Sequence, residues 1–250
     1  MIVLGALLLV GVVTEHLLYF PLTPVSLDLP TDLDGQVRLP PAPGRLRLLF
    51  VGDTLLGDRA AGTLAYRGHD HPFAATAGLI RGADLAVGNL EGPIALGGEQ
   101  ARKRWSYRMS PLAAAALAGA GFDAMSLGNN HIRDCGDRGV AESIGWLRAA
   151  GVAPFGAGMT GAEAHGPALL EVDGVRVALL GYMAPFLETD RGRHSMRHLA
   201  WGPRQGGAGL GTPENIARDV RQARGRADLV LVVIHLGDRY REQPTAAERA

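Results

Sequence analysis

Short apolar runs alternate with helix-like segments from residue 45 onward. Mostly apolar runs bounded by turn formers are typical of buried strands, whereas apolar positions that recur every three or four residues indicate helices. We therefore expect strands at 46–51, 84–87, 123–127, 168–172, 175–182 and 228–234, and helices at 72–81, 111–120, 139–150 and 213–224. Strands that alternate with helices predict an α/β fold. The almost wholly apolar last run predicts a sheet that is covered on both faces.

Local signals mark the ends of several of these elements. Asp173 and Gly174 separate two expected strands, and Asp-Gly at such a place is a strong signal for a hairpin turn. Thr212 stands directly before the last expected helix, where its hydroxyl can serve as the N-cap. Gly121 follows an alanine-rich segment and predicts the end of a helix there.

Residues 2–13 form an unbroken apolar run near the start of the chain. Spanning a bilayer needs about 20 such residues, and extending the run that far includes Glu15 and His16. The run is interpreted as a signal peptide or a membrane anchor, with a buried helix as the alternative. No basic residue precedes it to decide between the first two. We favour an anchor over residues 1–22, which places the folded part of the protein outside the cytoplasm at the cell membrane.

A proline-rich stretch over residues 23–44 lacks any sustained periodicity and is typical of a semi-extended linker. The folded domain is therefore expected over residues 45–250. The chain is 47% hydrophobic, which is ample for a buried core in a domain of this length.

The charge balance bears on whether the protein binds nucleic acid, and the cysteine content bears on disulfides and metal sites. Lys plus Arg and Asp plus Glu both number 25, and no long basic run could follow a phosphate backbone, so nucleic acid is not an expected partner. The single cysteine, Cys135, excludes an internal disulfide. We interpret it as a small buried hydrophobe, with a soft metal ligand as the alternative.

Polar side chains gather at the ends of the expected strands. Asp53, Glu91, Asn130, His131 and His235 each lie just past an apolar run. Each alone has a structural reading, such as a helix cap, a solvated loop carboxylate or a turn former. Because parallel strands bring their carboxyl ends to one edge of a sheet, we expect all five to form one site. Such a mixture of carboxylate, amide and imidazole suits divalent manganese, zinc or iron, and two ions about 4 Å apart could clamp a phosphoryl group.

Two further amides accompany this set. Asn89 precedes Glu91 by two positions, and Asn129 directly precedes Asn130. We predict that both contact substrate. The alternative is that Asn129 and Asn130 supply hydrogen bonds within a difficult turn.

The motifs around these residues resemble those of the CapA family, which is named for poly-gamma-glutamate capsule synthesis. The matching segments are residues 50–57, 87–93, 119–123, 125–136, 156–158 and 235–237. The family is similar in fold to the calcineurin-like metallophosphoesterases. The resemblance therefore implies a four-layer α/β/β/α sandwich with metals at the strand ends.

The same resemblance implies a role for each of the five positions. Asp53 would be a ligand from the first motif, Glu91 would replace a bridging aspartate, and Asn130 would bind the second metal. His131 would contact phosphate or act as a general acid. His235 would be another metal ligand.

Two departures from the family pattern lie near the end of the chain. Family members ordinarily continue into a Gly-His-His-Pro-His segment, whereas this chain stops at Ala250, so the sandwich is expected to be truncated at its C-terminus. An acidic residue common in the fourth motif is Arg239 here, with Asp238 beside it. We expect weaker binding of the second metal in such a chain.

Two functions of different class fit these features. The first is a metal-dependent hydrolase, acting on a phosphoester or on an amide of a γ-glutamyl polymer. The second is a non-catalytic, membrane-anchored partner of the capsule synthesis machinery that binds the anionic polymer. The basic run Arg102, Lys103 and Arg104 could serve that binding, although such a run is usually a solvated face. Trp105 and Tyr107 alternate as on one face of a strand and are expected in the core, with a platform for a sugar as the alternative.

Overall fold

A computed structural model describes residues 46–189 and 192–236. The expected membrane anchor at 1–22, the linker at 23–44, and Asp238 and Arg239 lie outside these described residues. Within the described part, no helix has the length and apolar character needed to cross a membrane.

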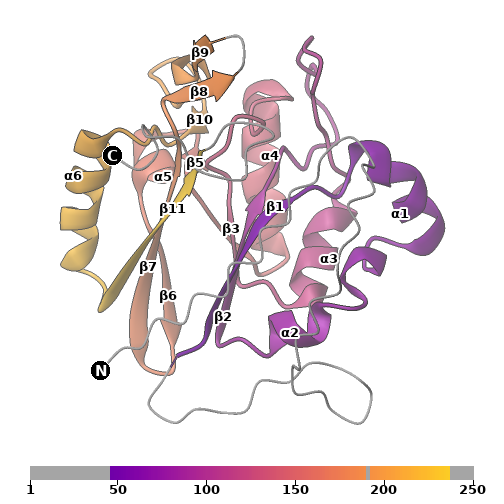
Figure 1. Ribbon diagram of the computed structural model, residues 1–250, viewed down its shortest axis with the longest axis horizontal. Coiled ribbons are helices and arrows are strands. Elements are labelled where there is room, and N and C mark those ends of the chain that lie inside the picture. The colour runs from indigo at the N-terminus through magenta and orange to yellow at the C-terminus, as the bar shows by residue number, and fades with distance from the viewer. Residues whose placement is uncertain (1–45, 190–191, 237–250) are drawn as a thin grey trace.

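The first of two main sheets is parallel and has the strand order β1-β2-β3-β4. Its strands are β1 (Leu48–Thr54), β2 (Leu85–Leu90), β3 (Ala124–Ser126) and β4 (Ala153–Phe155). Four helices pack on its outer face, at the centre and right of Figure 1: α1 (Ala61–Arg67), α2 (Ala77–Arg81), α3 (Leu112–Ala120) and α4 (Gly136–Ala149). Short 3-10 turns at Asp58–Ala60 and His71–Phe73 lead into α1 and toward α2.

The second sheet has the order β11-β7-β6 and lies against the first. Strand β11 (Leu229–His235) runs parallel to β7 (Val175–Met183), and β6 (Ala168–Val172) pairs with β7 as an antiparallel hairpin. Helix α6 (Pro213–Arg224) covers part of its outer face, and α5 (Gly161–His165) packs beside β7.

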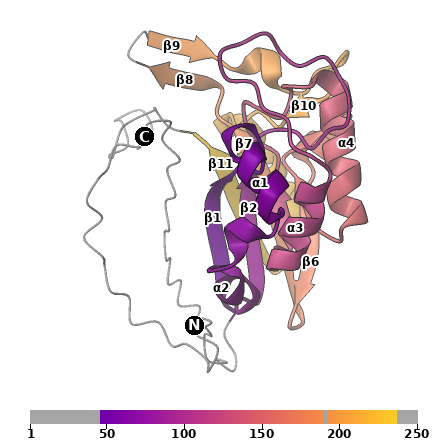
Figure 2. The same ribbon diagram turned by 90° about the vertical axis from the view of Figure 1, so that its right-hand side faces the viewer.

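Smaller elements complete the chain near the carboxyl ends of the strands. Strand β5 (Ala157–Gly158) pairs with β10 (Gly207–Ala208), and β8 (Phe186–Thr189) pairs with β9 (Gly192–Ser195). Figure 2 shows the β8–β9 hairpin projecting from the body of the molecule. A 3-10 turn at Arg197–Leu199 follows it.

Three separate groups of buried side chains confirm the expected α/β/β/α order of layers. Alternate residues of β2 point to opposite faces, so Leu90 packs with the helices while Leu85 packs between the sheets. Strand β7 divides in the same way: Leu179 lies between the sheets and Leu180 packs toward α6. The two sheets and two helical layers therefore meet at three buried interfaces, one for each group of side chains.

Several expected elements are confirmed with small shifts. The 168–172 and 175–182 strands form the β6–β7 hairpin, and both turn residues have positive φ, 48° at Asp173 and 78° at Gly174. This is the backbone of the tight turn that Asp-Gly favours. Thr212 caps α6 through a hydrogen bond from the Asn215 amide.

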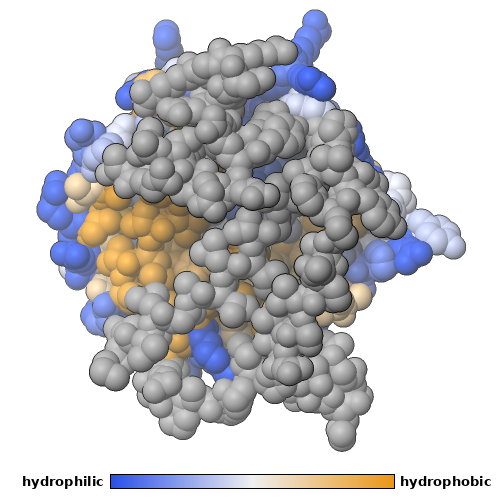
Figure 3. Space-filling view, in the orientation of Figure 1, coloured by the Kyte–Doolittle hydropathy of each residue, from blue (hydrophilic) through white to orange (hydrophobic). Residues whose placement is uncertain are grey.

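Other expectations were wrong in detail. The single helix expected at 72–81 is a 3-10 turn followed by the short α2. The run at 228–234 is only partly covered on its outer face among the described residues, because α6 packs on Val230 but leaves Val232 39% and Ile234 37% exposed. Figure 3 shows hydrophobic surface in the region of β11. The run is apolar because one face packs between the sheets and Val230 packs toward α6.

Candidate metal centre

The five predicted site residues meet where the carboxyl ends of the two sheets come together. Asp53 is the last residue but one of β1, and Glu91 directly follows β2. Asn130 and His131 lie in the turn after β3, and His235 is the last residue of β11. The first four come from one sheet and His235 comes from the other. The site therefore depends on how closely the two sheets approach each other.

Glycines allow that close approach. A Cβ atom on Gly128 would lie 2.7 Å from the Tyr182 backbone nitrogen, and one on Gly156 would lie 2.9 Å from the Gly181 Cα. Both distances are shorter than real Cβ contacts, so a side chain at either position would push the sheets apart. This gives a physical reason for glycine at 128 and 156, which belong to two of the motifs that carry the family resemblance.

Asp53, Glu91 and His235 form a compact group of ligand atoms. One carboxylate oxygen of each acid and a ring nitrogen of His235 all lie within 4.8 Å of one another. The Asn130 Oδ1 is 2.8 Å from the other ring nitrogen of His235. Two carboxylates and an imidazole are a donor set that fits a borderline divalent cation, whereas the Asn130 oxygen lies on the opposite side of the imidazole. In the described residues no other group of three such side chains is this close.

The charges in this group are strongly coupled. Burial alone would raise the pKa of Asp53, but the hydrogen bond and charge of His235 hold it below its ordinary value. Burial dominates at Glu91 and raises the pKa of that carboxyl. Burial would lower the pKa of His235, yet the charges of Glu91 and Asp53 raise it from 6.5 to about 9. The His235 imidazolium thus offsets carboxylate charge at neutral pH, and coordination of a metal would require loss of its proton.

His131 is held by a carboxylate that the sequence did not single out. Its Nδ1 lies 2.7 Å from Asp134 Oδ2, and its Nε2 faces Glu91 Oε1 at 3.7 Å. Asp134 is buried, and Lys103 Nζ lies 2.5 Å from its second oxygen. The Tyr107 ring packs on the His131 ring with centroids 4.3 Å apart. The contact with Asp134 fixes the imidazole, so Nε2 is the nitrogen that faces the ligand group.

These contacts bear on two expectations about the segment that precedes α3. Tyr107 and Trp105 do not lie on a strand, and Tyr107 is half-buried against His131 instead of lying in the main core. The basic run is solvent-exposed as expected, since Arg102, Lys103 and Arg104 are all exposed, and Lys103 in addition pairs with buried Asp134.

The two predicted substrate contacts are buried. Asn89 is 6% exposed and Asn129 is not exposed, and the amide of each is hydrogen-bonded to protein groups. Their geometry favours a role in shaping the site over direct contact with substrate. Cys135 is buried as expected, which raises the pKa of its thiol, and it lies outside the group of ligand atoms.

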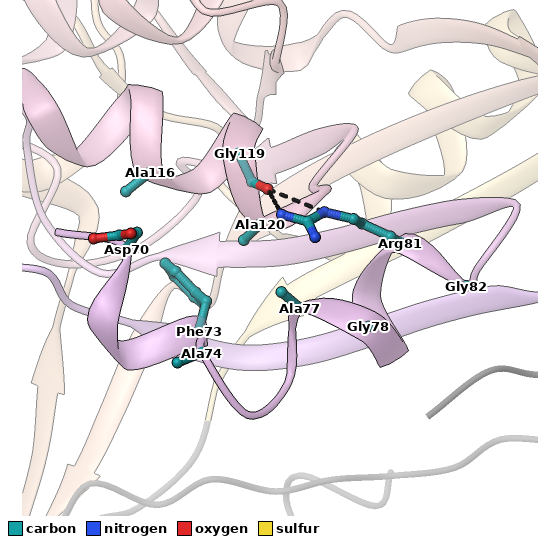
Figure 4. Close-up of a pocket in the computed structure, with 10 residues that line it drawn as sticks. All are labelled: Asp70, Phe73, Ala74, Ala77, Gly78, Arg81, Gly82, Ala116, Gly119 and Ala120. Atoms are coloured by element: carbon teal, nitrogen blue, oxygen red, sulfur yellow. Dashed lines mark hydrogen bonds between the residues drawn. The ribbon is translucent and has the colours of Figure 1, made fainter. Parts of the chain in front are cut away.

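Two hollows differ in their relation to this site. A recess of about 20 Å³, roughly the room for one water, lies directly beside it. Its lining consists of Asn130, Met183, Ala184, Phe186, Met196, His235 and Leu236. A cavity of about 460 Å³ lies among α2, α3 and the turn at Phe73, and no predicted site residue lines it (Figure 4). There Arg81 donates a hydrogen bond to the Gly119 carbonyl oxygen.

Comparisons with known proteins agree with the motifs. The family described as "Bacterial capsule synthesis protein PGA_cap" matches residues 47–250. "Capsule biosynthesis protein CapA" of Bacillus anthracis is 27% identical over 214 residues, which cover 82% of this chain and 50% of that protein. "PGA biosynthesis protein CapA" of Bacillus subtilis is 26% identical over 203 residues, which cover 80% and 51%.

Among solved structures, a hypothetical protein from Thermus thermophilus aligns with a TM-score of 0.41 and 18% identity, covering 77% of this chain and 58% of that one. The chain spans about half the length of the two CapA relatives. Because the family model matches most of the chain, the resemblance found in the motifs is confirmed. The chain belongs to the family of bacterial capsule synthesis proteins.

Proposed function

We propose that this chain provides a divalent metal centre to capsule polymer synthesis, and that the centre hydrolyses a phosphoester or an amide of a γ-glutamyl polymer. The observation that carries the proposal is the group formed by Asp53, Glu91 and His235, whose ligand atoms lie within 4.8 Å of one another. These residues come from the ends of three strands in two sheets, and hydrogen bonds from Asn89 hold the two carboxylates together.

Asp53, Glu91, Asn130 and His235 would hold manganese, zinc or iron, as one ion or two. Such an ion supplies a Lewis acid and lowers the pKa of water. Half-exposed Asp53 keeps the group open to solvent on one side, whereas Glu91 closes it on the other. A small anionic group could therefore reach the centre from the side of Asp53.

His131 is the proposed general acid. Asp134 Oδ2 lies at hydrogen-bond distance from its Nδ1 and orients the ring, which leaves Nε2 to donate a proton toward a leaving group. Tyr107 covers one face of the ring and restricts its rotation. We also propose that the N-terminal segment anchors the chain in the cell membrane. The folded domain would then act outside the cytoplasm, together with the capsule synthesis machinery.

Metal content and turnover together test this function. The full chain, purified without chelator, would be analysed for metal by mass spectrometry. It would then be assayed on bis-p-nitrophenyl phosphate and, by product length, on poly-γ-glutamate. We expect bound metal and hydrolysis in the wild type, loss of both in Asp53→Ala, and loss of turnover with metal retained in His131→Ala. Asp228→Ala removes an exposed carboxylate paired with Arg176 and serves as the control with unchanged metal content.

The same experiment separates the non-catalytic alternative. A wild type that holds no metal, together with polymer binding that survives both Asp53→Ala and His131→Ala, would favour a polymer-binding partner over a hydrolase. Metal without turnover on either substrate would retain the centre and reject the proposed hydrolysis.

A further inference from the structure

Two buried amides connect the ligand carboxylates to the turn that carries His131. Asn89 is the last residue but one of β2, and Asn129 lies in the turn after β3. Asn89 is 6% exposed and Asn129 is fully buried. Buried amides of this kind need their hydrogen bonds satisfied within the protein. Their partners therefore show what the two side chains do.

Backbone groups fix the orientation of the Asn129 amide. The His131 N–H can only donate, and it lies 3.0 Å from Asn129 Oδ1. The Leu90 carbonyl oxygen can only accept, and it lies 2.7 Å from Asn129 Nδ2. The oxygen and nitrogen of this amide are thus assigned by partners that have a single role.

This assignment fixes Asn89 in turn. Asn129 Nδ2 donates its second hydrogen bond to Asn89 Oδ1, at 3.1 Å. The Asn89 nitrogen must then face the other way, where it donates to Asp53 Oδ1 at 2.7 Å and to Glu91 Oε2 at 2.8 Å. It also lies 3.4 Å from His235 Nδ1. One amide nitrogen therefore lies against Asp53, Glu91 and His235, the three side chains of the compact ligand group.

We propose that Asn89 and Asn129 are positioning residues that set the metal affinity of this centre. An amide NH₂ has two hydrogens, and each holds one carboxylate, so both acids keep their other lone pairs free for a cation. Asn89 does this without adding negative charge between two acids that already repel each other. Asn129 makes no hydrogen bond to a ligand side chain; it holds the Asn89 amide in its orientation and also accepts from the backbone of the turn that carries His131. The inference rests on the proposed metal centre and adds the residues that align it.

Mn²⁺ binding to the chelator-treated full chain tests this inference, measured by titration calorimetry together with the unfolding midpoint of the metal-free protein. Asn89→Ser removes both donors to the carboxylates, and we expect Mn²⁺ to bind roughly 10- to 100-fold more weakly. Asn129→Ser should also weaken binding, although its side chain contacts no ligand. The double variant should lose less than the sum of the two single losses, because the effect of Asn129 on the carboxylates passes through Asn89.

Ser143→Ala is the matched control. Ser143 is buried and hydrogen-bonded to Gly139 and Ile94, away from the ligand atoms, so its loss should lower the unfolding midpoint and leave Mn²⁺ affinity unchanged. If Asn89→Ser does not fold, Asn129→Ser answers the same question. Folded variants that bind Mn²⁺ as the wild type does would overturn the positioning role alone. A wild type that does not bind Mn²⁺ would overturn the metal centre together with it.

Discussion

Replacing Gly128 with alanine tests whether the approach of the two sheets builds the metal centre. The added Cβ would meet the Tyr182 backbone nitrogen at 2.7 Å and the Gly181 and Tyr182 carbonyl carbons at 3.0 Å. These are main-chain atoms of β7, so rotation of a side chain cannot relieve the contact. Ordinary van der Waals contact begins at 3.4 Å, so β7 must move by about 0.7 Å. Overpacking of this kind costs about 1–3 kcal/mol.

The movement also reaches the site. Strand β7 pairs with β11 along its length, and the last pair joins Met183 to His235. A shift of β7 therefore carries His235 away from Asp53 and Glu91. Metal–ligand distances tolerate changes of only about 0.2 Å, so metal affinity should fall along with stability.

Urea unfolding and Mn²⁺ titration of Gly128→Ala measure the two effects separately. Gly145→Ala is the control, because Gly145 is an exposed residue of α4 with open space around its Cβ position. It should stabilise the protein by about 0.4–1 kcal/mol and leave the affinity unchanged. If Gly128→Ala matched the wild type in both stability and affinity, the close contact between the sheets would not be what holds the site together.

Three further predictions concern charge, capping and packing. In the metal-free protein the raised pKa of His235 contributes stability that is complete below pH 6.5 and lost as the pH rises through about 9. Thermal unfolding midpoints should fall across that window, and a fall of the same size in His235→Gln would contradict this. Thr212→Ala should cost about 1 kcal/mol in urea unfolding through loss of the α6 cap, whereas no change would show that the cap is not needed. Leu117→Ala, at a fully buried position, should cost about 2–5 kcal/mol, and a loss below about 1 kcal/mol would be inconsistent with the packing around α3.

The fold could be predicted from the sequence wherever an element is long or has a specific turn. The β6–β7 hairpin and α6 are of this kind. Strand β4 has only three residues, one of them Pro154, and gives no periodic signal. The prediction that β11 is covered on both faces was wrong. An apolar run indicates that both faces contact neighbouring elements, but it does not indicate how completely those elements cover the strand.

Some residues of the candidate site could be predicted from the sequence and others could not. The five residues at strand ends were brought together because parallel strands share an edge, a rule that needs no knowledge of side-chain contacts. Asp134 and Lys103 come from irregular segments, and the only signal for Asp134 was its place three residues after His131. The burial of Asn89 and Asn129 depends on the stacking of sheet ends, which sequence spacing does not encode.

His235 belongs to the second sheet, whereas Asp53 belongs to the first. A cation bound to His235 and Asp53 would link the two sheets. Metal binding and the packing of the sheets against each other would then be thermodynamically coupled. Because such coupling is reciprocal, a molecule that separates the two sheets would weaken metal binding, and bound metal would weaken the binding of that molecule by the same free energy.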